Sequence, residues 1–306
     1  MDKDLEIIFR DMEEEGLMNW LRDKKSPKSI KLVKKMKMDV DKIAINGIQG
    51  QFIVKHEYAP KGFLSVVSSQ MYRQVGINTP QVCLLGTEDK KVVNTIQEDV
   101  TGIASVETIL AFYDTLYNAK IDSVGFGRFK WQIFYDRSIE EMFLKFMTPN
   151  CLEQLKDIFL ADELRTDIDR HLENYFLVKR KGSEKYEGII VVDLDQMIIY
   201  NYCGTGKDDF ENFLMYPYAS HTPQVVVDRA CYKQRVVDLC ELIQDGVLSD
   251  GNIETLKKIL QTDFPKDLMQ ACKKQRLSRR VLNNVVNPVE YLWEYNNQTV
   301  GRELGL

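Results

Sequence analysis

The residues best suited to chemistry lie in one short polar segment, where Asp169, His171 and Asn174 fall within six residues. A further carboxylate, Asp193, follows the apolar run 189–192. Phosphoryl transfer needs one carboxylate to orient a nucleophilic hydroxyl, and an amide and another carboxylate to hold Mg²⁺. These residue types therefore favour a phosphate-transfer site, provided that a phosphate-binding half lies elsewhere in the chain.

A hairpin is predicted to bring the two candidate metal ligands together. Its first strand, its polar turn and its second strand are expected over residues 175–179, 180–185 and 188–192. The bases of a hairpin lie side by side, so Asn174 and Asp193 should be neighbours, as two ligands of one Mg²⁺ must be. Asp169 could face the same place from the preceding loop. Asp195 is either a second metal ligand or an alternative to Asp193.

The candidate for the phosphate-binding half is a strand, glycine turn and second strand over residues 43–55, and the second strand ends at Lys55. Gly47 and Gly50 permit a sharp turn and a close approach of the backbone to a ligand. Amide groups in such a turn can bind phosphate. A simple hairpin turn would also use two glycines. The turn therefore indicates phosphate binding only in combination with the elements around it.

Those elements predict an α+β, bilobal, protein-kinase-like fold. A helix over 62–75 that ends at Gly76, then strands over 81–85 and 91–96, complete the order of a kinase small lobe. The small lobe is expected over residues 1–98 and a mostly helical large lobe over residues 99–306. A further N-terminal helix and a lysine-rich strand with one solvated face are expected over residues 4–23 and 30–40. Large-lobe helices are expected over residues 106–117, 138–147, 151–164, 225–244, 252–261, 265–280 and 288–295.

Composition excludes several classes of protein. The net charge of −5 gives no bulk attraction to nucleic acid or to an anionic membrane. The six cysteines form no Cys-x-x-Cys pair, and with three histidines they show no zinc-binding spacing. Reduced thiols of a cytoplasmic protein are the expected reading. The N-terminus does not resemble a signal peptide, and no apolar run reaches the length of a membrane span.

Four short motifs resemble those of the HipA-like kinases, which are distant relatives of the phosphoinositide kinases. Residues 169–174 resemble the D-R-H-x-x-N catalytic loop, and residues 46–51 resemble the S-G-x-Q-x-K glycine loop. Residues 52–55 are similar to the strand that carries the ATP lysine, and residues 76–80 to the G-I-x-x-P that follows the helix. The layout resembles small, single-chain members of the CtkA type. The order of four motifs is more specific than any one of them.

The resemblance implies an ATP- and Mg²⁺-dependent kinase that phosphorylates Ser or Thr of a protein. Asp169 would orient the acceptor hydroxyl, and His171 would hold the loop by hydrogen bonding. Asn174 and Asp193 would bind Mg²⁺, and Lys55 would contact the ATP phosphates. The residues implied to cover the phosphates are Asn46, Gly47, Gln49 and Gly50. The residues implied to meet the adenine through the backbone are Gln97, Glu98 and Val100.

One departure from the family pattern keeps other functions open. The helix after the lysine strand usually carries a Glu that pairs with the lysine, but the corresponding position lies near Ser65, and residues 62–75 contain no acid. A nucleotide-binding pseudokinase or interaction protein is therefore an alternative, as is a kinase of a small molecule or lipid. A protein substrate is the expected partner, without direct nucleic-acid or membrane binding. An antitoxin-like regulatory partner follows from family analogy alone.

Overall fold

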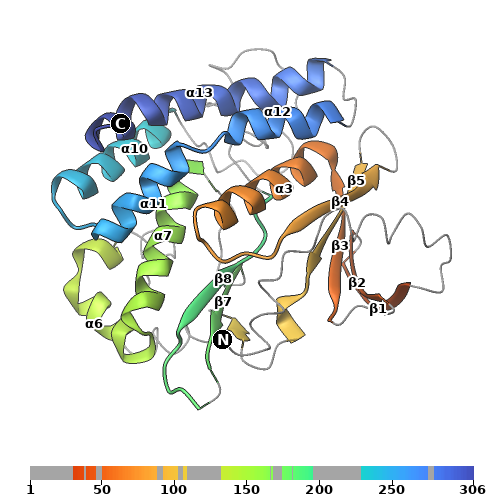
Figure 1. Cartoon of the computed structure of the whole chain (residues 1–306), viewed down its shortest axis with the longest axis horizontal. Coiled ribbons are helices and arrows are strands. Elements are labelled where there is room, and N and C mark those ends of the chain that lie inside the picture. The colour runs from red at the N-terminus through yellow and green to blue at the C-terminus, as the bar shows by residue number, and fades with distance from the viewer. Residues whose placement is uncertain are drawn as a thin grey trace.

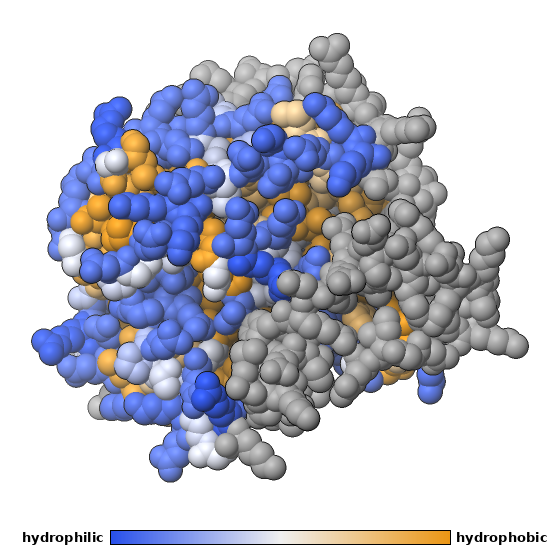
Figure 2. Space-filling view, viewed as in Figure 1, coloured by the Kyte–Doolittle hydropathy of each residue, from blue (hydrophilic) through white to orange (hydrophobic). Residues whose placement is uncertain are grey.

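The structure is a computed structural model. It describes residues 30–37, 39–45, 50–87, 92–102, 106–108, 132–165, 167, 174–180, 182–195, 229–274 and 279–306. Over this part of the chain the fold is α+β and bilobal: a five-stranded antiparallel sheet stands beside a mostly helical lobe (Figure 1). Hydrophilic residues cover most of the described surface on the side viewed in Figure 2, with smaller hydrophobic areas over the helical lobe. No helix in the described ranges is long and apolar enough to cross a bilayer.

The small-lobe sheet follows the predicted order of elements, with β3 at its centre. Its strands, in spatial order, are β1 (Ile30–Lys37), β2 (Val40–Ile45), β3 (Phe52–Tyr58), β5 (Val92–Glu98) and β4 (Val82–Thr87). Side chains alternate between the faces of a strand. Phe52 and Val54 accordingly enter a small core with Ile96, so Lys55 and Glu57 point to the opposite face. That face is the one on which α3 (Ala59–Gln74) packs.

Three residues of the sequence determine where α3 begins, where it ends and how closely it packs on the sheet. It begins three residues before the predicted start because Pro60 stands in its first turn, where a missing N–H costs nothing. It ends before Gly76, whose φ is +93°, and the Ile77 N–H donates to the Tyr72 carbonyl at 2.8 Å. At Gly62 an added Cβ would lie 2.2 Å from Val93 Cγ2. Glycine therefore allows α3 to lie directly on β5.

The large lobe is mostly helical and shares its core with α3, which lies alongside α12 (Figure 1). Its helices are α6 (Arg137–Phe146), α7 (Pro149–Arg165), α10 (Arg229–Gln244), α11 (Asp250–Leu260), α12 (Phe264–Lys274) and α13 (Arg279–Glu303). One continuous hydrophobic cluster runs from α3 through α7 to α13. Because α3 belongs to this cluster, the two lobes are joined by apolar packing as well as by the chain between them.

The predicted hairpin is present as β7 (Tyr175–Val178) and β8 (Gly188–Val191), which pair in antiparallel register. All four residues of β7 are buried, as are the last three of β8. The third strand of this sheet is β6 (Val106–Thr108), which pairs with β7. The helix predicted from residue 106 is wrong over this stretch, because pairing with β7 prevails over the apolar spacing that suggested a helix.

Two further expectations need correction. Helix α13 passes through Pro288, although that proline was expected to begin a helix; α13 packs against α10 and α12, and this packing supports a helix that contains a proline. Strand β1 was expected to expose only its lysine face, yet Leu32 and Met36 are exposed as well. It is an edge strand with two irregularities in its pairing to β2. The predicted helix over 4–23 lies outside the described residues.

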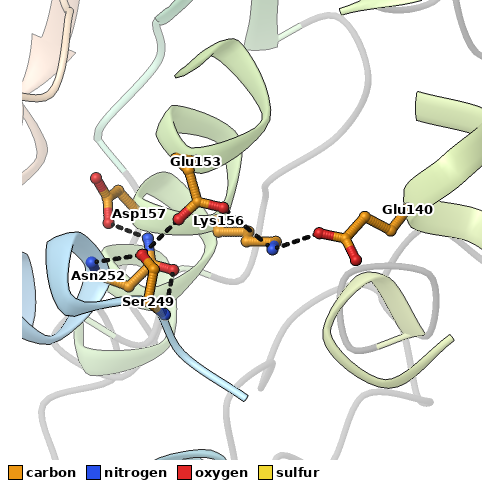
Figure 3. A network of polar contacts seen from close by, with 6 residues as sticks. All are labelled: Glu140, Glu153, Lys156, Asp157, Ser249 and Asn252. Atoms are coloured by element: carbon orange, nitrogen blue, oxygen red, sulfur yellow. Dashed lines mark hydrogen bonds and ion pairs between the residues drawn. The ribbon is translucent and has the colours of Figure 1, made fainter. Parts of the chain in front are cut away.

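Polar contacts also join α6, α7 and the start of α11 (Figure 3). Lys156 on α7 donates to Glu140 of α6 and to Glu153, both at 3.2 Å. Ser249 caps α11 by accepting from the Asn252 N–H and donates to Glu153 at 2.5 Å. Each charged group of this cluster therefore stands on a regular helix or at a satisfied helix end.

Candidate active site

A lysine of the small lobe and a carboxylate of the large lobe meet at the junction between the lobes. Lys55 lies on β3, opposite Thr95 of the neighbouring strand β5. Asp193 lies two residues beyond the end of β8. Lys55 Nζ forms an ion pair with Asp193 Oδ1, and the side chains are 17% and 34% exposed. The fold thus joins two predicted site residues that are 138 positions apart.

The backbone at Asp193 is unusual. Its φ of +62° makes it, within the described ranges, the one residue other than glycine with a positive φ. Aspartate tolerates this left-handed conformation better than most side chains, and such conformations gather at functional sites. The Val192 N–H donates to the Asn174 carbonyl at 2.9 Å, so the hairpin closes just before Asp193. Asn174 is buried at the other base of the hairpin, as predicted.

Asp195 occupies a different environment from Asp193. Its side chain is only 3% exposed, and Lys61 Nζ lies 2.7 Å from its Oδ2. Lys55 Nζ lies 3.8 Å from the same oxygen. Burial raises the pKa of Glu57, and the Asp195 carboxyl group raises it further. Asp195 is therefore buried between two ammonium groups.

Charge and burial act against each other in this cluster. Burial raises the pKa of Glu57 to about 7, assisted by Asp195 and opposed by Lys55. A hydrogen bond of 2.9 Å from Thr95 Oγ1 also favours the ionised form of Glu57. Burial alone would lower the pKa of Lys55, but the carboxylates of Asp193, Asp195 and Glu57 outweigh it and raise that pKa above its ordinary value. Lys55 is thus a firmly charged cation.

Arg165 connects three segments that surround the site. It ends α7, is fully buried, and donates to Ser68 Oγ on α3 and to the Leu194 carbonyl, the latter at 2.7 Å. It also forms an ion pair with Asp167. One guanidinium therefore contacts α3, the segment between Asp193 and Asp195, and the residue two positions before Asp169. Its planar set of donors suits such a three-way contact better than a lysine would.

The chain leaves the small-lobe sheet at the end of β5, within the segment 97–100 that was predicted to be the hinge. Strand β5 ends at Glu98, and the Asp99 N–H donates to the Gln51 carbonyl at 2.9 Å. Gln97 lies on the Lys55 face of the sheet by alternation, and Glu98 on the other. Val100, at the start of the short helix η2 (Val100–Gly102), already packs on the large-lobe hairpin. Gly50 is exposed with a φ of +103°, and a Cβ there would lie 3.5 Å from Glu98 Oε1.

Some predicted residues lie outside the described part of the chain: Asn46, Gly47, Gln49, Asp169 and His171. Sequence reasoning missed three residues that the structure places at the site. Glu57 could have been found, because residues two apart on a strand share a face with Lys55. Lys61 gave no comparable signal, because its partner Asp195 is more than a hundred positions away. The same holds for Arg165, whose partner Leu194 is about thirty positions away.

The side-chain donors of Asp193 and the side-chain carbonyl group of Asn174 are oxygen atoms, the kind of ligand that Mg²⁺ prefers. In the described ranges no group of three His, Cys, Asp or Glu side chains could hold a metal ion. Mg²⁺ is usually bound by one or two carboxylates together with substrate phosphates and water. Asp193, with a partly exposed carboxylate beside Asn174, matches that smaller requirement.

Comparisons with known proteins agree with the architecture. No family model and no curated protein matches this chain. The crystal structure of the proinflammatory kinase CtkA from Helicobacter pylori is similar to it, with a TM-score of 0.56 and 15% identity, over 90% of this chain and 95% of that one. Choline kinase LicA from Streptococcus pneumoniae has 12% identity over 93% of this chain and all of its own, but its TM-score of 0.26 supports no argument. The likeness to CtkA concerns the fold alone, and the chain has the bilobal protein-kinase-like fold.

Proposed function

We propose that this protein is an ATP- and Mg²⁺-dependent kinase of the HipA-like kind, which transfers the γ-phosphate to Ser or Thr of a protein. The observation that carries the proposal is the Lys55–Asp193 ion pair. Phosphoryl transfer depends mainly on positioning and on neutralising phosphate charge. A cation from the sheet and a carboxylate from the hairpin, facing each other between the lobes, are the pair that this chemistry requires.

We assign each predicted residue a role in this reaction. Lys55 is a firmly charged donor for phosphate oxygens, and Asp193 with Asn174 would hold Mg²⁺. When bound, Mg²⁺ neutralises charge on the phosphates. Asp169 orients the acceptor hydroxyl, and His171 holds its loop. The backbone around Gln97, Glu98 and Val100 meets the adenine, and the predicted glycine loop covers the phosphates with Asn46, Gly47, Gln49 and Gly50.

The absence of an acid on α3 does not argue strongly for a pseudokinase. Lys55 has carboxylates near it from other elements: Asp193 and Asp195 follow the hairpin, and Glu57 lies two residues further along the same strand. The usual helix Glu therefore has substitutes that keep Lys55 charged. Preference for a protein acceptor rests on the HipA-like motifs alone, because CtkA is described as a kinase without a stated acceptor.

A transfer assay tests the proposal. The full chain is incubated with γ-labelled ATP and Mg²⁺, with and without an added basic protein, and Asp193→Asn and Asp169→Ala are assayed beside it. We expect labelled Ser or Thr in the wild type and a loss of label in both variants. Asp263→Asn is the matched control, because Asp263 is an exposed acid of the α11–α12 turn that pairs with Lys266.

The outcomes separate the alternatives. A thermal shift with ATP and Mg²⁺ but no transfer would leave a nucleotide-binding pseudokinase. Label on a lipid or small molecule, with none on protein, would overturn the protein acceptor but keep the phosphotransferase. The absence of both nucleotide binding and phosphate transfer would overturn the kinase proposal.

A further inference from the structure

We call residues 193–195, which carry both candidate metal acids, the metal-binding segment. Helix α3 brings a cation to this segment, whereas the family usually has a carboxylate on that helix. Lys61 lies in the first turn of α3, and its Nζ is 2.7 Å from Asp195 Oδ2. The contact is largely shielded from water, since the side chains are 26% and 3% exposed. Charge-assisted contacts of this kind are stronger and more directional than exposed ion pairs.

The two acids of the segment are consequently not equivalent. Asp193 is 34% exposed and stands on left-handed backbone directly after the hairpin. Asp195 is almost wholly buried, and it forms ion pairs with Lys61 and Lys55. Turning Asp195 toward a metal would leave the Lys61 ammonium without this partner in a mostly buried place, which is costly.

The position of Lys61 is itself fixed by its neighbours. Gly62 lies so close to Val93 of β5 that α3 has little freedom to shift along the sheet. On the other side, Arg165 holds the Leu194 carbonyl, one residue before Asp195. The segment that carries both acids is therefore held by a cation from α3 and by a cation from α7.

We propose that Lys61 and Asp195 form a latch between α3 and the metal-binding segment, in which both are positioning residues and Asp193 alone is the carboxylate ligand of Mg²⁺. This inference rests on the proposed kinase function and deepens it. The latch holds the segment so that Asp193 is presented beside Asn174. It also gives α3 a means of acting on the site without a glutamate.

The test is a Mg²⁺ titration of nucleotide binding, followed by calorimetry or by thermal shift with ATP present throughout. In Asp193→Asn we expect no Mg²⁺-dependent binding at any concentration. In Lys61→Met and Asp195→Asn we expect binding to survive but to need about 10–100-fold more Mg²⁺, as is typical when a group supporting a metal ligand is lost. The double variant should resemble either single variant, because both changes open the same latch.

Two controls and a second readout complete the design. Lys61→Arg should restore most of the Mg²⁺ affinity, and Lys266→Met, which alters an exposed lysine paired with Asp263, should leave it unchanged. The wild type, Lys61→Met, Asp195→Asn and the double variant form a double-mutant cycle. Their urea unfolding, without Mg²⁺ or nucleotide, should give a favourable coupling energy between the two residues.

Three results would contradict the latch. One is normal Mg²⁺ affinity in Lys61→Met, and another is the absence of coupling in the unfolding cycle. The third is loss of Mg²⁺-dependent binding in Asp195→Asn together with retention in Asp193→Asn, which would make Asp195 the ligand. A wild-type protein that binds no nucleotide with Mg²⁺ would instead refute the proposed function, and the unfolding cycle would still judge the ion pair.

Discussion

Two lysines of this protein, Lys55 and Lys156, are each flanked by two carboxylates, but their surroundings differ. Lys156 is 8% exposed and lies 3.2 Å from both Glu140 and Glu153 (Figure 3). Lys55 is 17% exposed and lies between Asp193 and Asp195. By composition alone the two clusters would receive the same interpretation.

The difference lies in the backbone that carries the acids. Glu140 and Glu153 stand on α6 and α7, and both are a little over one-third exposed. Asp193 and Asp195 stand on irregular chain after β8, one on left-handed backbone and the other buried. A helix-borne cluster can relax toward water, whereas the Lys55 cluster is held in an unfavourable arrangement by the fold. Such an arrangement favours function, so the comparison predicts that removal of Lys55 lowers phosphate transfer and that removal of Lys156 does not.

The largest expected effect is that of Lys55→Met on catalysis. Loss of a preorganised cation at the transferring phosphate should lower the rate of γ-phosphate transfer by about 10²–10³-fold. The unfolding midpoint in urea should fall as well, because Lys55 offsets carboxylates that are costly to bury without a cation. A transfer assay and urea unfolding on the same preparation measure both. A destabilised variant with full residual activity would reverse our interpretation of this cluster.

The next effect concerns pH and Glu57. Its pKa is raised from 4.5 to about 7 in the folded protein, so the folded state holds this proton more tightly than the unfolded state. The stabilisation is fully present below pH 4.5 and is lost as the pH rises through 7. The loss should be on the order of 3 kcal/mol in the free energy of unfolding.

Glu57→Gln isolates this contribution because it removes the titrating group and keeps the size of the side chain. From pH 5 to pH 8, the free energy of unfolding of the wild type should fall relative to that of the variant. Parallel pH profiles would show that Glu57 does not titrate in this range and that the Lys55 cluster is less strained than we infer.

Lys156→Met should lower stability without lowering phosphate transfer, unlike Lys55→Met. We expect a loss of about 1–2 kcal/mol in stability, because two hydrogen-bonded ion pairs disappear while the partly exposed glutamates keep much of their hydration. Phosphate transfer should be unchanged under conditions in which the variant is folded. A specific loss of transfer without a change in stability would mean that the α6–α7 cluster also serves the site.

The smallest effect is that of Ser249→Ala at the start of α11. Ser249 accepts from the Asn252 N–H in a capping box and donates to Glu153. Its loss should cost about 1 kcal/mol, the usual value for an N-cap, with no effect on transfer. Double-mutant analysis with Lys156→Met should show coupling, since both residues contact Glu153; independent effects would separate the cap from the lysine cluster.

The sequence by itself determined the elements whose signals are local. Apolar spacing located α6 and α7, Gly76 marked the end of α3, and two apolar runs on either side of a polar turn located β7 and β8. Because a hairpin closes on itself, the sequence could also place Asn174 and Asp193 at its two bases. These features depend on a few neighbouring residues, so periodicity and turn chemistry are sufficient to find them.

Tertiary structure decided what depends on contacts between distant segments. Residues 106–108 became a strand because β7 offers a partner, and α13 passed through Pro288 because neighbouring helices support it. Lys55 acquired Asp193 as its partner across 138 positions, and Lys61 enclosed Asp195. No local pattern encodes such pairings. They arise when packing of α3 against the sheet and against α12 brings strand, helix and hairpin to one place, which is why the sequence showed two candidate metal acids and the fold distinguished their surroundings.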